Sequence, residues 1–214
     1  IEDLGETDMA AADARSVADA YALLARVLPG RPLFVTLGDQ SLFEAVLAAL
    51  GLPRGWRMRL ARAFGSHAML ETALADLANP PRNAALPQPV AMMALDGDLE
   101  ALTAHIAAGM EKAGLPATAG RTAADIARRL VEKAQLRSVR LSDEAFSALQ
   151  HFLAIDVPLA EAVTSLQIFS DKAGLSLDMA LAGFSARADA MARHGLPLDS
   201  IRYDAAFGRP LDYY

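Results

Sequence analysis

Cysteine is absent from the 214-residue sequence, which excludes disulfide bonds and thiolate metal sites and leaves the redox compartment open. Histidine is scarce, and no two of the four histidines lie three, four or five positions apart. That spacing is the one a helix needs to place two imidazoles on one metal ion. We therefore expect surface or helix-end histidines, and we predict neither a metal site nor a cofactor. The four residues are His67, His105, His151 and His194.

Long hydrophobic runs are also missing. Hydrophobic residues make up 53% of the sequence, but charged residues interrupt every stretch before it reaches the roughly 18 apolar residues that a membrane-spanning helix needs. Much of the hydrophobicity is alanine, the best helix former. The N-terminus lacks a basic segment followed by an apolar one, the pattern of a secretory signal. These features predict a soluble, mostly helical chain that works in the cytoplasm without membrane contact.

Positive charge is in the minority, because the formal net charge is −6. This balance argues against a nucleic-acid surface over the whole chain. The glycine-rich phosphate-binding motifs and the GxSxG nucleophile motif do not occur either. One basic run, Arg54 to Arg62, has two readings: a solvated helix face, or a contact with a phosphate or an acidic partner. The first is favoured, because Arg57 and Arg59 do not share a helix face.

Apolar residues recur at helical spacing over most of the sequence. The pattern predicts three helices before Gly65 and an almost wholly helical segment from Ser66 to Pro197, whose helices each have an apolar and a charged face and should pack as a bundle. Polar residues suited to capping precede several of these helices: Thr7 or Asp8, Asp39, Thr122 with Asp125, and Ser142.

Two segments read as strands. The apolar run 33–37 ends at Gly38-Asp39 and predicts a buried strand, and residues 201–208 alternate with the period of two typical of a strand. Another strand is expected to begin at 211. The nearest candidate partner of these terminal strands is 33–37, on the other side of the helical segment. We therefore expect an α+β fold with three parts: a core at 1–65, a helical insertion at 66–198, and the core again at 199–214, continuing beyond it.

The segment 207–214 carries the most chemistry. The Arg209 guanidinium is a planar, permanently charged group that matches a carboxylate or phosphate. Tyr213 and Tyr214 are adjacent, so in a strand one can line a pocket while the other packs behind it. Gly208 allows close backbone approach, and Pro210 favours an irregular turn or bulge. The alternative is an Arg–Asp pair at a strand edge with the tyrosines in the core.

A family resemblance enters at these residues. Arg209-Pro210-Leu211-Asp212-Tyr213-Tyr214 resembles the Arg-Gly-Leu-Asp-Tyr-Tyr signature of histidyl-tRNA synthetases. With Tyr203-Asp204 before it, the segment is more similar to the synthetase paralogues that serve as regulatory subunits of ATP phosphoribosyltransferase, the enzyme that opens histidine biosynthesis. The similarity extends to several earlier segments and is looser in the alanine-rich central helices. The segments are Gly5-Glu6-Thr7-Asp8, Ala11-Ala12-Asp13-Ala14, Leu37-Gly38-Asp39 with Leu42-Phe43, and Leu47 to Phe64.

The resemblance implies a partial class II aminoacyl-tRNA synthetase-like core, an antiparallel sheet with flanking helices, interrupted by the helical insertion. It implies a non-catalytic subunit that assembles with the short-form catalytic subunit, self-associates, and mediates feedback by histidine. The residue matched by Arg209 contacts the histidine carboxylate and the activated phosphate in the synthetases. Those matched by Tyr213 and Tyr214 help to form the imidazole pocket.

Two other functions stay open at this point. One is a true histidyl-tRNA synthetase, which activates histidine with ATP. Pro210 stands where the synthetases have glycine, and the upstream synthetase motifs are absent, so the regulatory reading is favoured. The other is a helical protein-interaction module without a ligand, in which Arg209 and the two tyrosines are only packed.

Overall fold

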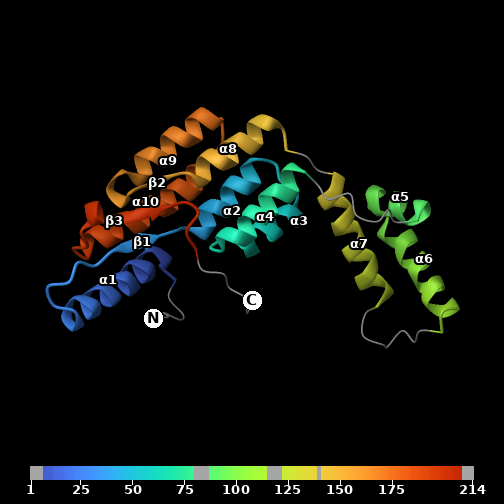
Figure 1. Cartoon of the computed structure of the whole chain (residues 1–214), viewed down its shortest axis with the longest axis horizontal. Coiled ribbons are helices and arrows are strands. Elements are labelled where there is room, and N and C mark those ends of the chain that lie inside the picture. Colours follow the sequence, from blue (N-terminus) through green and yellow to red (C-terminus); the bar gives the residue numbers. More distant parts are fainter. Residues whose placement is uncertain (1–6, 80–86, 115–121, 139–140, 209–214) are drawn as a thin grey trace.

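The computed structural model describes residues 7–79, 87–114, 122–138 and 141–208 (Figure 1). Their fold is mostly helical with one small sheet, in agreement with the α+β prediction. The helices are α1 Met9–Val27, α2 Gln40–Ala49, α3 Arg54–Ala63, α4 His67–Ala78, α5 Gln88–Asp96, α6 Leu99–Lys112, α7 Ala123–Ser138, α8 Asp143–Leu153, α9 Leu159–Ala173 and α10 Asp178–Arg193. The strands are β1 Val35–Leu37, β2 Asp156–Pro158 and β3 Ile201–Asp204, and a short 3₁₀ helix, η1 Leu198–Ser200, precedes β3.

Helix starts follow the capping residues that the sequence contains. Asp8 accepts a hydrogen bond from the Ala11 N–H, Asp39 from the Leu42 N–H, and Ser142 from the Ala145 N–H. Thr122 and Asp125 form the reciprocal bonds of a capping box at the start of α7. All four predicted N-termini are therefore confirmed, with Asp8 rather than Thr7 as the N-cap of α1.

The sheet has the order β1-β3-β2. β1 runs parallel to β3, with Val35 opposite Ile201, and β2 runs antiparallel to β3, with Val157 opposite Tyr203. The pairing of 33–37 with the terminal strand is thus confirmed. The purely antiparallel sheet that the resemblance implied is not what the described strands form, because β1 returns to β3 in the same direction. The class II synthetase-like core and the division at residues 65 and 198 stay predictions.

Both predicted strands are shorter than expected. Pairing in the first covers only Val35–Leu37, and Phe34, which precedes the strand, is 89% exposed. The second ends at Asp204, whose carboxylate accepts a hydrogen bond from the Ala206 N–H at 2.8 Å and turns the chain. Phe207 is consequently 46% exposed and does not join the buried face. The strand expected from 211 lies outside the described residues.

β2 was not predicted and corrects the almost wholly helical reading of 66–197. It has three residues between α8 and α9, too few to show an alternation in the sequence. Its exposed Asp156 pairs with Arg202 of β3, with an N–O distance of 2.6 Å. The pair joins the two strands at the sheet surface.

The buried side chains form two separate clusters. The main core combines residues of α1–α4, α8–α10 and the sheet, with an aromatic series in which Phe43 lies 4.7 Å from Phe64 and 6.3 Å from Phe152. A second cluster belongs to α5, α6 and α7, which we call the three-helix unit. Figure 1 shows this unit beside the rest of the fold, and α7 contacts α3.

Candidate functional site

The residues predicted to bind a ligand, Arg209, Tyr213 and Tyr214, lie outside the described residues. The structure does place the chain that leads to them. The Gly208 backbone packs directly against the Phe64 ring and the Gly65 Cα, so closely that a Cβ at 208 would overlap the ring. This contact fits the prediction that Gly208 serves a close backbone approach.

The carboxyl ends of β1 and β3 meet at one edge of the sheet, because the two strands are parallel. Gly38 follows β1, and the Phe207 carbonyl oxygen occupies the place that a Cβ of Gly38 would need. Glycine is therefore required at 38 for the segment after β3 to pass this edge. The end of β1, the start of α2 and the segment 205–208 are thereby held together.

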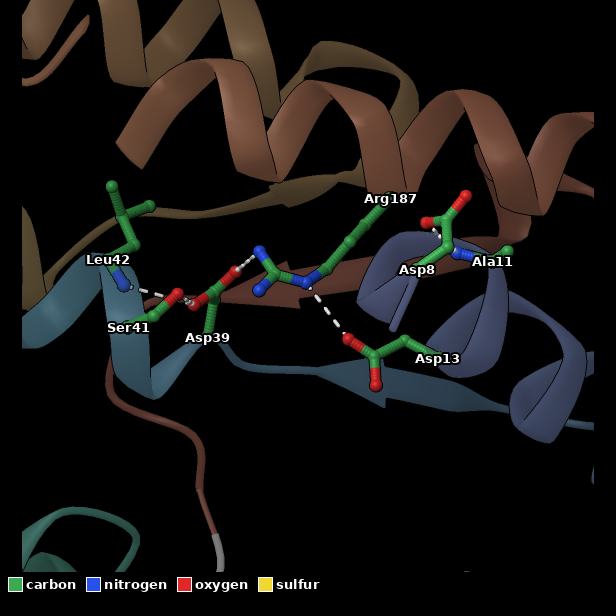
Figure 2. Close-up of polar contacts among 7 residues, drawn as sticks. All are labelled: Asp8, Ala11, Asp13, Asp39, Ser41, Leu42 and Arg187. Carbon is green, nitrogen blue, oxygen red and sulfur yellow. Dashed lines mark hydrogen bonds and ion pairs between the residues drawn. The ribbon is translucent and has the colours of Figure 1, made fainter. Parts of the chain in front are cut away.

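Arg187 of α10 connects this edge to α1 (Figure 2). Its Nε donates to the Asp13 carboxylate at 2.9 Å, and its Nη1 donates to the Asp39 carboxylate at 2.9 Å. The Arg187 side chain is 25% exposed, against 44% for Asp13 and 8% for Asp39. A guanidinium between two carboxylates gives directed, charge-assisted hydrogen bonds. The two contacts fix α1, α2 and α10 relative to each other.

Asp39 has two roles, of which the sequence showed one. Its Oδ1 caps α2 and also accepts a hydrogen bond from the Ser41 hydroxyl, whereas its Oδ2 pairs with Arg187. The N-cap was predicted because capping partners lie three residues apart. The ion pair was missed because Arg187 lies 148 positions further along the sequence.

Tyr203 lies buried beside this cluster. Its ring packs edge-on against Phe184 at a centroid distance of 4.9 Å, and its hydroxyl has no hydrogen-bond partner within the described ranges. Burial raises the pKa of the Tyr203 phenol far above its ordinary value, and the negative charges of Asp39 and Asp204 raise it further. The phenol is therefore held in its neutral form.

A cavity of about 480 Å³ opens between α1, the start of α2 and α10. We call it the Arg187 pocket. Its polar lining includes Asp13, Ser16, Asp39, Gln40, Ser41 and Arg187, and its apolar lining includes Leu37, Leu159, Phe184 and Met191. The arrangement offers charged hydrogen-bonding groups beside an apolar floor, which is the usual chemistry of a small-molecule site.

The other sequence candidates have simpler environments. His67 forms an exposed pair with Glu71, at an N–O distance of 3.1 Å, and His194 is the C-cap of α10. Arg59 pairs with Asp76 of α4, and its guanidinium lies 5.0 Å from the centre of the Trp56 ring. Part of the basic run therefore stabilises the contact between α3 and α4. Within the described ranges no three His, Asp or Glu side chains gather as a metal site.

Comparison with known proteins shows close relatives along the whole chain. It is 71% identical over 214 residues to the ATP phosphoribosyltransferase regulatory subunit of Mesorhizobium japonicum, and 61% and 51% identical to those of Chelativorans sp. and Rhizobium johnstonii. The whole chain is homologous to these regulatory subunits. The resemblance inferred from the sequence is therefore confirmed. The chain spans 57% of the length of these three relatives.

Two other comparisons gave no match. No protein-family model matches the chain, and no solved structure matches it. Among the helices of the described ranges, none combines the length and the hydrophobicity that a membrane crossing needs.

Proposed function

We propose that the chain is part of a non-catalytic regulatory subunit of ATP phosphoribosyltransferase, acting in histidine biosynthesis in the cytoplasm. The observation that carries this proposal is the 71% identity over all 214 residues to a protein of that name. In the proposed role the subunit associates with the short-form catalytic subunit and with further copies of itself, supports catalytic activity, and transmits inhibition by histidine.

For the histidine site we propose Arg209, Tyr213 and Tyr214. The guanidinium would pair with the carboxylate of histidine, and the two tyrosines would line the space around the imidazole. Support comes from the described chain just before them, since Gly38 and Gly208 both admit close backbone contacts that direct the chain past the carboxyl edge of β1.

A reconstituted enzyme assay tests the proposal. The full-length protein that contains this chain is co-expressed with a short-form catalytic subunit, and formation of phosphoribosyl-ATP is followed with and without L-histidine. We expect co-purification, activity that depends on the regulatory subunit, and inhibition by histidine. Arg209→Ala should leave co-purification intact and weaken inhibition roughly tenfold or more, since a charge-assisted contact is lost.

Two outcomes would contradict the proposal in different ways. Histidine-dependent exchange between ATP and pyrophosphate by the full-length protein alone would indicate a histidyl-tRNA synthetase. Co-purification with unchanged inhibition in the Arg209→Ala variant would indicate a helical interaction module whose terminal segment is only packed.

A further inference from the structure

In the Arg187 pocket, some hydrogen-bonding atoms of the charged side chains take no part in the ion pairs between them. Arg187 donates through Nε and Nη1, so its Nη2 group has no partner in the described part of the chain. Asp13 accepts through Oδ2, its Oδ1 has no hydrogen-bond donor among the described residues, and the side chain is 44% exposed. One guanidinium nitrogen and one carboxylate oxygen of the same ion-pair cluster therefore remain available to a ligand.

The surroundings of these groups suit a small zwitterion. Asp39 is only 8% exposed, and its oxygens are occupied by the α2 cap and by Arg187, which makes it a fixed part of the wall. Ser16 and Gln40 add neutral polar groups, and Phe184 lies on the apolar side. At about 480 Å³ the cavity is in the range of small-ligand sites and larger than one amino acid.

We propose that the Arg187 pocket binds a free amino acid in its zwitterionic form. The α-carboxylate accepts hydrogen bonds from the guanidinium of Arg187, the α-ammonium donates to Asp13, and the side chain lies against the apolar lining formed with Phe184. The two carboxylates and one guanidinium of the pocket carry one net negative charge, and a zwitterion, which is neutral overall, leaves that charge unchanged. This site is additional to Arg209, Tyr213 and Tyr214, and only its probe, L-histidine, rests on the proposed function.

Ligand analogues test which groups the pocket recognises. Isothermal titration of the chain with L-histidine is compared with L-histidinol, which lacks the carboxylate, and with imidazolepropionate, which lacks the ammonium. We expect both analogues to bind at least about tenfold more weakly, because each removes one charge-assisted contact. Equal affinity for histidine and either analogue, or no binding of histidine, would overturn the proposal.

Variants test the location. Ser16→Trp fills the pocket from α1 without removing an ion pair, and Gln40→Trp does so from α2 if the first variant fails to fold. The matched control is Met179→Trp on α10, because Met179 is 92% exposed and lies outside the pocket lining. We expect at least about tenfold weaker histidine binding by a pocket variant and wild-type binding by the control.

The result separates this inference from the proposed function. Unchanged binding in folded Ser16→Trp and Gln40→Trp variants would refute the pocket while leaving the assay with the catalytic subunit unaffected. Loss of histidine binding in these variants would support the pocket. If the wild-type full-length protein also failed to support a catalytic subunit, the regulatory role alone would be rejected.

Discussion

The main core and the three-helix unit bury different kinds of side chain. The main core contains Trp56, Tyr203, Phe43 and Phe152 among its fully buried residues. The buried cluster of the three-helix unit consists of Ala94, Leu102, Ala127, Val131 and Ala134. Burial free energy rises with the apolar area removed from water. The three-helix unit therefore gains much less free energy from apolar burial, and we expect it to unfold before the main core.

The two regions also differ in how far along the sequence their contacts reach. Arg187 ties α10 to Asp13, 174 positions away, whereas the polar contacts of α7 at Thr122 and Asp125 span three. Long-range ties make the main core cooperative, because loss of one element removes contacts of the others. Local contacts let the three-helix unit unfold by itself.

Gly38→Val should have the largest effect. A side chain at 38 overlaps the Phe207 carbonyl, which belongs to the backbone and cannot move aside alone. We expect a loss of at least about 3 kcal/mol in the free energy of unfolding, measured by thermal or urea denaturation. Gly109→Ala in α6 is the control, since nothing lies within 4 Å of its added Cβ. It should be neutral or stabilise by about 0.5–1 kcal/mol. Similar midpoints for both variants would contradict the role assigned to Gly38.

Phe43→Ala and Leu102→Ala compare the two clusters directly. Both side chains are fully buried. Phe43→Ala should cost about 3–5 kcal/mol and lower hydrogen-exchange protection throughout the main core. Leu102→Ala should cost about 2–3 kcal/mol and lower protection only in α5, α6 and α7. Loss of protection in α8 to α10 after Leu102→Ala would show that the two regions unfold as one unit.

Local features of the fold could be predicted from the sequence, and long-range ones could not. The helix caps at Asp8, Asp39 and Ser142 involve neighbours three residues away, so residue type and spacing were enough. β2 was not predicted because three residues are too few to show the alternation of a strand. The exposure of Phe34 depends on which other elements cover that residue, and only the assembled fold determines this.

The candidate site divides in the same way. Arg209, Tyr213 and Tyr214 form a contiguous motif, so resemblance could single them out. The Arg187 pocket is assembled from α1, the start of α2 and α10, which lie far apart in the sequence, so no local pattern marks it. Asp39 was predicted as a helix cap, and its ion pair with Arg187 was missed.

Tyr203→Phe should change the stability of the main core, and not that of the three-helix unit, at alkaline pH. The buried phenol keeps its proton when folded, because burial raises its pKa, while the unfolded chain releases it above about pH 10. The stabilising contribution is therefore complete below about pH 10 and is lost as the pH rises further. Near neutral pH the variant should change stability by less than about 1 kcal/mol, because the hydroxyl has no partner among described residues. At pH about 11 it should retain main-core exchange protection better than the wild type. The same alkaline unfolding midpoint for both proteins would contradict this.

Asp125 should give the smallest effect, confined to the three-helix unit and to acid pH. The Thr122 hydroxyl and then the Thr122 N–H lower the pKa of Asp125, with Arg128 adding to the effect. A carboxylate with a lowered pKa contributes stability at neutral pH that is lost as the pH falls below about 4, through its folded-state pKa. Protection factors of the first turn of α7 should therefore decline on acidification before those of α10. Asp125→Asn should start with lower protection in that turn and show a weaker dependence on pH. An equal decline of the protection factors in α10 would mean that the capping box does not control the opening of α7. The same conclusion would follow if protection in Asp125→Asn depended on pH as it does in the wild type.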